Sequence, residues 1–213
     1  MNRLAILGAG GHGKVVADAA LLQGCSGIAF FDDEWPRVAA TGPWPVSGTL
    51  TDLVASRPVG GAVVAIGDNT VRLVKQRTLA EAGIFLFTVV HPRAAISSFA
   101  EIGAGSVVFA GAVVNAFARL GLGCIVNTAA TVDHDCVLAD GVHLSPGAHL
   151  GGGVSVGPRS TIGIGASVKH GVSIGADVMV GAGAAVIDHI PDGLTVVGVP
   201  ARPIVRLDSF PSL

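Results

Sequence analysis

Aliphatic residues recur at every sixth position along the stretch from Ile96 to Pro191. Counted from Ile96, the first place of each six is aliphatic in sixteen of sixteen units, and the register never slips. The fifth place is mostly a small residue, and glycine is concentrated in the second and fourth places. A period of six fits neither the 3.6-residue period of an α-helix nor the alternation of an isolated strand. It is typical of a parallel β-helix, in which short strands stack coil upon coil.

Each place of the repeat has a structural explanation in such a β-helix. The aliphatic first place points into a narrow interior, and the small fifth place fits where the walls converge. Glycine suits corners that need positive φ or close backbone approach. With three sixes to a triangular coil, the stretch predicts a little over five coils, or about 25 Å of stack at ~4.8 Å per strand spacing. The unbroken aliphatic phase disfavours the alternative of a flexible Gly/Ala-rich segment.

The first 90 residues follow a different pattern, in which apolar runs alternate with helical segments. This alternation is typical of an α/β unit with a parallel sheet, and four strands suit a mononucleotide-sized unit better than a full dinucleotide fold. The predicted strands are 4–7, 28–31, 62–66 and 84–90, and the predicted helices are 14–22, 49–55 and 70–82.

His91-Pro92 lies where the two patterns meet, and proline ends the preceding strand. We therefore expect two domains, a Rossmann-like unit over residues 1–90 and a β-helix domain over residues 91–213. The segment from Asp192 onward would cap the open end of the stack, as any solenoid requires.

Three polar or glycine-rich segments follow the predicted strands of the first domain. Gly8-Ala9-Gly10-Gly11-His12-Gly13 matches GxGxxG between a strand and a helix, where backbone N–H groups and the helix dipole favour phosphate. Asp32-Asp33 follows the second strand, about twenty residues further on, where acidic residues commonly meet a ribose or a base edge. Gly67-Asp68-Asn69 follows the third strand. These segments predict a nucleotide site, although turn and capping roles explain each one singly.

Composition narrows the function classes. Hydrophobic residues make up 50% of the chain and charged residues 13%, and we assign the apolar excess to the coil interior and a subunit interface. No apolar run approaches the length of about 18 residues that a spanning helix needs. The net charge of -2 gives no case for nucleic acid or an anionic membrane surface. The short apolar run at Leu4–Leu7 is no signal peptide, so we expect a cytoplasmic protein.

Cysteine usage gives no sign of a disulfide or a metal site. Cys25, Cys124 and Cys136 form no CxxC pair, and two of them occupy the small fifth place of the repeat. We expect them to be small buried residues.

One unit of the repeat carries titratable residues in all three places between its inward positions, namely Val132-Asp133-His134-Asp135-Cys136. Alternation directs His134 outward. Three interpretations compete: a solvated corner, a metal site that lacks further ligands at diagnostic spacing, and a general base. An imidazole flanked by a carboxylate has a fixed tautomer and raised basicity, so it could take a proton from an amine or a hydroxyl group.

Together, these motifs resemble a known family. GAGGHGKVV, FFDD, VAIGDNTVR, HPRA, the repeat, VDHDC and VGVPARPI occur in the order found in the nucleotide-amino-sugar N-acetyltransferases of the PglD and NeuD type. The resemblance covers nearly the whole chain. It implies a homotrimer with a left-handed β-helix that transfers acetyl from acetyl-CoA to the 4-amino group of a UDP- or GDP-linked amino-deoxysugar, for glycan synthesis and with no metal.

The resemblance also implies roles for individual residues. The catalytic base falls on His134, which would deprotonate the amine as it attacks the thioester directly, and the acid that tunes it falls on Asp135, where some relatives have Glu. Nucleotide-sugar contacts fall on Gly10, Gly11, His12, Asp32, Asp33 and Gly67. Acetyl-CoA contacts fall on His143, Gly152, Ile164 and Ala182, the last of which is often glycine in relatives.

Two other functions stay open at the level of sequence. The first is a sugar O-acetyltransferase of the sialic-acid type, since the same base serves a hydroxyl group. The second is a non-catalytic scaffold that binds a nucleotide sugar through the first domain.

Overall fold

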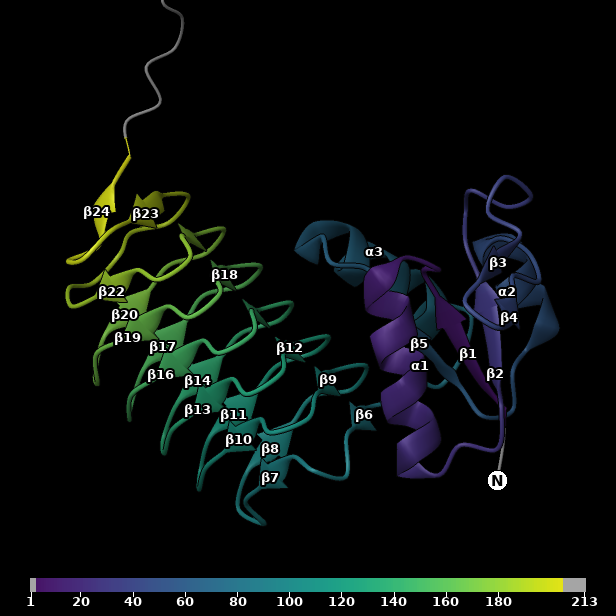
Figure 1. Cartoon of the computed structure of the whole chain (residues 1–213), viewed down its shortest axis with the longest axis horizontal. Helices are drawn as coiled ribbons and strands as arrows, with labels where there is room; N and C mark the ends of the chain where they lie inside the picture. Colours follow the sequence, from purple (N-terminus) through teal and green to yellow (C-terminus); the bar gives the residue numbers. More distant parts are fainter. Residues whose placement is uncertain (1–2, 205–213) are drawn as a thin grey trace, which may run out of the picture.

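The computed structural model describes residues 3–204 and shows an α/β unit packed against one face of a β-helix (Figure 1). The α/β unit contains a three-stranded parallel sheet in the order β2-β1-β5. The predicted strands 4–7 and 28–31 are confirmed, and the predicted helices lie within a few residues of the observed ones. The elements are β1 (Leu4–Leu7), α1 (Gly11–Gln23), β2 (Ile28–Phe31), α2 (Leu50–Ser56), β5 (Ala62–Val64) and α3 (Asn69–Glu81).

The prediction of a single strand over residues 84–90 is wrong. Leu86 forms only an isolated bridge to Ala62 at the edge of the α/β sheet, whereas β6 (Val89–Val90) pairs with β9 (Val107–Val108) in the β-helix. The two ends of this apolar run bond to different sheets, because both sheets present an unpaired edge to it. An apolar run alone does not show where its backbone changes partner.

The predicted loop at residues 35–45 contains a small antiparallel pair, β3 (Ala40–Thr41) and β4 (Trp44–Pro45). Gly42 has a φ of 56° in the turn between them. The indole of Trp44 packs against Phe30 with 5.6 Å between ring centroids, so the loop is fastened to β2. The prolines in this segment concealed a hairpin that is only two residues long on each side.

The second part of the chain is a left-handed parallel β-helix with three sheets. Strands pair with those 18 residues later, as Val114 with Val132 and Val132 with Leu150, so three hexapeptides make one coil as predicted. One sheet contains β7 (Ala95–Ile96), β10 (Val113–Val114), β13 (Thr131–Val132), β16 (His149–Leu150), β19 (Ser167–Val168) and β22 (Ala185–Val186). A second contains β8 (Glu101–Ile102), β11 (Arg119–Leu120), β14 (Val137–Leu138), β17 (Ser155–Val156) and β20 (Ser173–Ile174).

The third sheet faces the α/β unit and carries the end of the chain. It contains β6, β9, β12 (Ile125–Val126), β15 (His143–Leu144), β18 (Thr161–Ile162), β21 (Met179–Val180), β23 (Thr195–Val197) and β24 (Arg202–Pro203). The last strand pairs antiparallel with β23, and this pair ends the sheet. The remainder of the segment that we expected to cap the stack, residues 205–213, lies outside the described residues.

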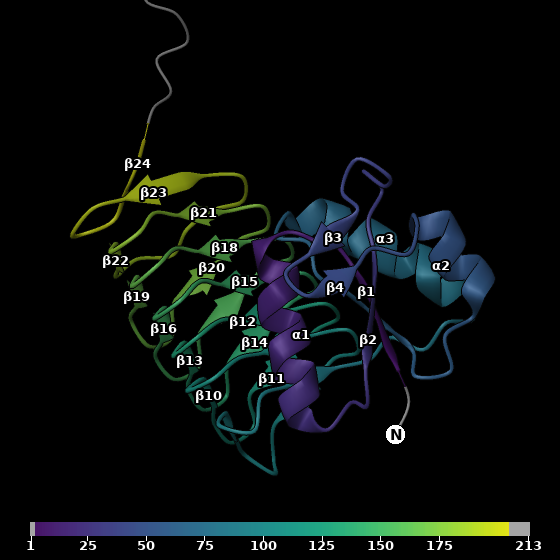
Figure 2. The ribbon, with the colours of Figure 1, turned by 45° about the vertical axis from the view of Figure 1, so that its right-hand side comes forward.

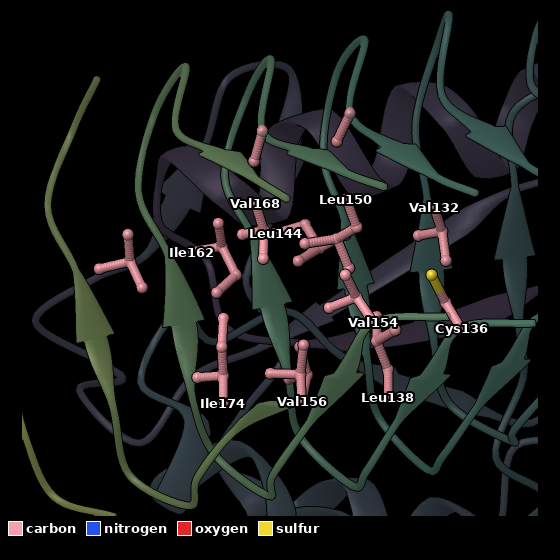
Figure 3. Packing of buried hydrophobic residues seen from close by; sticks show 14 of the residues in the cluster. Val132, Cys136, Leu138, Leu144, Leu150, Val154, Val156, Ile162, Val168 and Ile174 are labelled. Atoms are coloured by element: carbon pink, nitrogen blue, oxygen red, sulfur yellow. The ribbon is translucent and has the colours of Figure 1, made fainter. Parts of the chain in front are cut away.

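The first and fifth places of the repeat fill the interior (Figure 3). Val132, Leu138 and Leu144 point inward from the three sides of one coil and are almost fully buried. The thiols of Cys124 and Cys136 are buried, as predicted, whereas Cys25, which was also expected to be buried, is only partly so. Each of the two buried thiols donates to a backbone carbonyl oxygen at 3.3 Å, so the small fifth place also satisfies a buried polar group.

The fourth place turns the corner with a left-handed backbone. Every fourth-place residue from 105 to 183 has positive φ. Most are glycine, the residue that adopts this conformation without strain, and the exceptions are Phe117, Ala129, Asp135, Arg159 and Asp177. A side chain at the fourth place therefore stands out on a corner of the coil.

The α/β unit and the β-helix share a hydrophobic core. Figure 2 shows α1 lying across the sheet that contains β12 and β15. Val16 and Ala20 of α1 belong to the same buried cluster as Val107, Phe109 and Ile125 on the outer face of the β-helix. The shared cluster fixes the unit on this one face.

The polar face of α3 binds successive coils at a single corner. Its side chains donate to backbone oxygens that lie 18 residues apart: Gln76 to Gly105, Arg72 to Gly123 and Gly141, and Asn69 to Arg159. Side chains three or four residues apart on a helix are about 5–6 Å apart, close to the ~4.8 Å between coils. The helix therefore places about one polar side chain on each coil.

Arg72 is the centre of this contact and is only 1% exposed. Its guanidinium donates to the carbonyl oxygens of Ile66, Gly67, Gly123 and Gly141 and to Oδ1 of Asn69. No carboxylate of the described residues forms a salt bridge with it. Burial lowers the pKa of Arg72 to about 10, so the group keeps its charge at neutral pH. A buried cation thus fastens the turn after β5 to two coils.

We expect Arg72→Met to lower the free energy of unfolding by about 3 kcal/mol, because several buried carbonyl oxygens lose their donor. Urea denaturation followed by circular dichroism checks this. Arg77→Met, an exposed arginine on the same helix, is the matched control and should change stability little. Equal stability of the two variants would contradict the role of Arg72 in docking.

Candidate active site

The loops after the three parallel strands meet at the carboxyl edge of the α/β sheet. The carboxylate of Asp32, after β2, accepts a hydrogen bond at 2.8 Å from the N–H of Ala9 in the glycine segment after β1. Gly67 follows β5, and its carbonyl oxygen is held by Arg72. Ligands of open α/β sheets bind at this edge. The structure therefore brings the predicted nucleotide-binding segments together.

The glycines of the first segment have separate duties. Gly8 has a φ of 112°, and a Cβ atom there would lie 2.6 Å from the carbonyl oxygen of Ala65. A Cβ atom on Gly13 would lie 2.2 Å from the carbonyl oxygen of Gly8, so glycine is needed for α1 to pack against β1. Gly10 and Gly11 instead face open space.

Open backbone at the start of α1 suits a phosphate group. No atom would lie within 4 Å of a Cβ atom built on Gly10, Gly11 or Gly67, so a ligand could approach the main chain closely. The first N–H groups of α1 have no partner within the helix, and the helix dipole favours an anion there.

Asp33 contacts two helices rather than the glycine segment. Its carboxylate pairs with Lys75 of α3 and accepts a hydrogen bond at 3.0 Å from the N–H of Leu50 at the start of α2. Asp32 and Asp33 are therefore divided in their contacts: the first supports the glycine segment, and the second joins α2 to α3.

Two half-buried histidines lie between the α/β unit and the β-helix. His12 contacts the ring edge of Phe109, with 5.6 Å between centroids, and His143 on β15 has its Nε2 atom 3.3 Å from Nδ2 of Asn127. Burial, and secondly the positive charge of Arg72, lower the pKa of each imidazole to about 4. Both are neutral at physiological pH, and Nε2 of His12 is buried without a hydrogen-bond partner among the described residues.

His134 lies on a different part of the molecule, the corner between β13 and β14. Its side chain is 61% exposed, as the alternation predicted. Nδ1 lies 2.8 Å from Oδ2 of Asp135, whose φ of 59° places it at the outward corner. The hydrogen bond to Asp135 and then the charge of Asp133 raise the pKa of His134. An imidazole whose Nδ1–H is donated to a carboxylate has Nε2 available to accept a proton.

Gly152 lies one coil beyond His134, in contact with the imidazole. A Cβ atom there would lie 2.4 Å from Nε2 of His134, and the N–H of Gly153 donates to the carbonyl oxygen of His134 at 2.8 Å. Only glycine leaves room for the ring in this position. The structure therefore unites His134, Asp135 and Gly152 at one corner.

Ile164 and Ala182 occupy a third location, the corner that leads from β18 to β19 and its equivalent one coil later. Both are exposed, and the N–H of Gly183 donates to the carbonyl oxygen of Ile164 at 2.8 Å. Within one chain, the predicted acetyl-CoA residues are thus spread over two corners and, for His143, the face beneath the α/β unit.

Several residues in these places escaped the sequence interpretation. Asn127 and Phe109 contact the two buried histidines, and Asn115 contacts Asp133. The 18-residue coil could have found the last of these contacts, because Asn115 lies one coil before Asp133. No cluster of three or more His, Cys, Asp or Glu residues within residues 3–204 could hold a metal ion. No helix in that range is long and apolar enough to cross a membrane.

The buried histidines make stability depend on pH. The pKa of each imidazole is about 4 in the folded chain, below the ordinary 6.5. Between pH 4 and pH 6.5 the unfolded chain therefore binds more protons than the folded chain. The two imidazoles therefore contribute fully to the free energy of unfolding above pH 6.5. That contribution is lost as the pH falls towards 4, and the loss is on the order of 2 kcal/mol for each imidazole. The double variant His12→Gln, His143→Gln should show a flatter fall in urea denaturation over this range. His149→Gln, at an exposed position, is the control, and an unchanged slope in the double variant would refute the assignment.

Known proteins share both the sequence and the fold of this chain. Residues 3–79 match the family described as the PglD N-terminal domain. The acetyltransferase domain of PglB from Neisseria gonorrhoeae FA1090 is 45% identical, with a TM-score of 0.90 over 96% of this chain and 100% of that chain. A second structure of that domain, 46% identical over 95% and 99% of the two chains with a TM-score of 0.91, is a complex with acetyl coenzyme A.

A second enzyme is similar over the same length. PerB from Caulobacter crescentus, in complex with CoA and GDP-perosamine, is 40% identical, with a TM-score of 0.91 over 96% of this chain and 98% of that chain. UDP-N-acetylbacillosamine N-acetyltransferase from Bacillus subtilis (strain 168) is 40% identical over 113 residues. That alignment covers 52% of each protein, so it spans about half the length of the curated relative.

Proposed function

Because the chain belongs to the family of left-handed β-helix acetyltransferases that includes the PglB acetyltransferase domain and PerB, we propose that it acetylates the amino group of a nucleotide-linked amino sugar with acetyl-CoA. The observation that carries the proposal is the combination of an open glycine edge for a diphosphate with a carboxylate-bound histidine on the β-helix. The names of the relatives support an amine acceptor, since they include perosamine and bacillosamine N-acetyltransferases.

The proposed chemistry is direct attack of the sugar amine on the thioester. The nitrogen lone pair forms a bond to the acetyl carbon while Nε2 of His134 accepts the N–H proton. The tetrahedral intermediate then breaks its C–S bond, and the CoA thiolate leaves and takes a proton from the imidazolium or from water. Asp135 holds the tautomer and stabilises the imidazolium. Gly152 leaves the space that the ring occupies, and backbone N–H groups at such a corner could bind the oxyanion.

The two halves of this site lie on different sides of one chain. The nucleotide edge, which is the carboxyl edge of the α/β sheet at Gly10, Asp32 and Gly67, belongs to the unit that covers the sheet containing β12 and β15. His134 instead lies on the corner where the other two sheets of the β-helix meet. We therefore propose a homotrimer in which His134 of one subunit meets the nucleotide edge of a neighbour. Gly10, Gly11, His12, Asp32 and Gly67 would serve the nucleotide sugar, with Asp33 supporting from behind. Ile164, Ala182, Gly152 and His143 would serve acetyl-CoA.

An exposed aromatic pair supports contact between copies at the His134 corner. Phe99 and Phe117 are 65% and 59% exposed, with ring centroids 5.4 Å apart. They stand two coils and one coil before Asp135 at the same corner. Large exposed apolar side chains that gather in this way mark interaction sites. The cytoplasm stays the predicted location, since acetyl-CoA and nucleotide sugars are made there.

Purified protein should release CoA when mixed with acetyl-CoA and a UDP- or GDP-linked 4-amino sugar, and His134→Ala should lower kcat/KM about 100-fold or more. A thiol reagent detects free CoA, and mass spectrometry of the sugar product distinguishes an N-acetyl from an O-acetyl group. His149→Ala is the matched control. Binding of nucleotide sugar with no turnover on any amine or hydroxyl acceptor would favour a scaffold instead.

Co-expression tests whether the site forms between subunits. His134→Ala chains and Gly10→Val chains should each be inactive alone, since Gly10 lies where phosphate would bind and has room for the added side chain. Mixed trimers should regain part of the activity, because some sites then pair an intact His134 with an intact nucleotide edge. Light scattering reports the trimer, and failure of the mixture to exceed its parents would place the site within one chain.

A further inference from the structure

Asp133 joins His134 to the preceding coil. Its Oδ1 atom accepts a hydrogen bond at 2.8 Å from the backbone N–H of His134 and another at 2.8 Å from Nδ2 of Asn115. The N–H of Asn115 in turn donates to the carbonyl oxygen of Val132 at 2.9 Å. A short polar chain therefore runs from Asn115 through Asp133 to the backbone of His134.

This chain is specific to one coil. Residues 18 apart at this place of the corner are Ser97, Asn115, Asp133, Gly151, Lys169 and Ile187, so amide and carboxylate groups meet only at the coil of His134 and the one before it. The carboxylate of Asp140, at another corner, accepts a hydrogen bond at 2.8 Å from the N–H of Leu122 one coil earlier. Asp140 thus shows the structural use of such a bond at a corner that has no histidine.

We propose that Asp133 and Asn115 are positioning residues for His134, with Asp133 as a second carboxylate that fixes the ring's backbone and stabilises its protonated form. This inference rests on the proposed function of His134 as the base. The carboxylate of Asp135 contacts the imidazole ring of His134 directly, whereas the carboxylate of Asp133 accepts a hydrogen bond from the backbone N–H of His134. Asn115 neutralises neither carboxylate but locks the orientation of Asp133, since an amide donates without adding charge.

Few other charged groups lie near His134, so Asp133 and Asp135 dominate the electrostatic environment of its imidazole. Residues 115–117 on the coil before and 151–153 on the coil after carry no charged side chain. Lys169 and His170 lie two coils beyond His134 at the same corner, roughly 10 Å away by coil spacing. Asp133 and Asp135 are therefore the nearest charges to the imidazole within the chain, and Asp133 contributes to raising the pKa of His134.

The substitution Asp133→Asn tests the effect of the carboxylate charge apart from the effect of its hydrogen bonds. The asparagine Oδ1 atom can still accept both hydrogen bonds, so the fold is kept while the charge is removed. The pKa of His134, read by NMR titration of its imidazole, should fall relative to the unaltered protein. In the pH profile of kcat/KM, the acidic limb should move to lower pH, and the plateau should drop by about 2- to 10-fold because the base is weaker. KM for the nucleotide sugar should be unchanged.

Asn115→Ala should lower kcat by about 2- to 10-fold, the range for one lost hydrogen bond, with the thermal midpoint nearly unchanged. Asn115→Asp should not rescue it, because two carboxylates would repel. Asp140→Asn is the control and should alter neither the titration of His134 nor the pH profile.

An unshifted His134 titration in Asp133→Asn would overturn the proposal, as would the same loss of kcat in Asp140→Asn. The NMR titration needs no substrate, so it separates this inference from the proposed function. If the unaltered protein acetylates no amino sugar while the titration still shifts, the positioning contact stands and the function assigned to His134 fails.

Discussion

The 18-residue coil is the constraint on which the rest of this molecule depends. Three hexapeptides close one turn, and strand pairing then fixes each coil about 4.8 Å above the last. A residue at one place of the repeat consequently lies beside the residues 18 before and 18 after it. Every local feature, from the aliphatic interior to the left-handed corners, follows from this vertical alignment, and so do the contacts of His134 with Gly152 and of Asp133 with Asn115.

The same alignment explains how the α/β unit docks. α3 presents polar side chains at nearly the spacing of the coils, so the corner carbonyls at Gly105, Gly123, Gly141 and Arg159 act as a ladder for it. Glycine occupies this ladder where α3 lies close, since a Cβ atom on Gly141 would come within 2.7 Å of Leu73. Arg159 and Asp177 follow at the coils near and beyond the start of α3, where they pair with each other.

Buried charge gives the two candidate halves opposite proton chemistry. Arg72 has no ion-pair partner among the described residues, and burial together with the charge of Arg72 lowers the pKa of His12 and His143, which are therefore neutral. Neutral imidazoles suit hydrogen bonding to a ligand that already carries the charge of a diphosphate. At the other corner, two carboxylates raise the basicity of His134. These opposite protonation states agree with the proposed division of labour, in which the edge with His12 binds the nucleotide sugar and His134 accepts a proton.

Much of this architecture could be predicted from the sequence, because a repeating pattern constrains every unit at once. The period of six determined the coil, the inward positions, the burial of Cys124 and Cys136, and the outward direction of His134. The glycine and acidic segments, which we expected to line one ligand crevice, do meet at one edge of the sheet, and nucleotide binding there stays a prediction. The strand at residues 84–90 was wrong because an apolar run does not show which of two sheet edges its backbone joins.

Only the tertiary structure decided how these parts meet. Gln76, Arg72 and Asn69 look like ordinary polar residues of an amphipathic helix until the β-helix is placed beside them. His12 and His143 lie 131 positions apart in the sequence, and burial, which sets their protonation, exists only after the two units dock. Within one coil register the sequence determines neighbours, since spacing is fixed by the backbone. Between the α/β unit and the β-helix the sequence does not determine neighbours, because side-chain packing across that surface follows no sequence period.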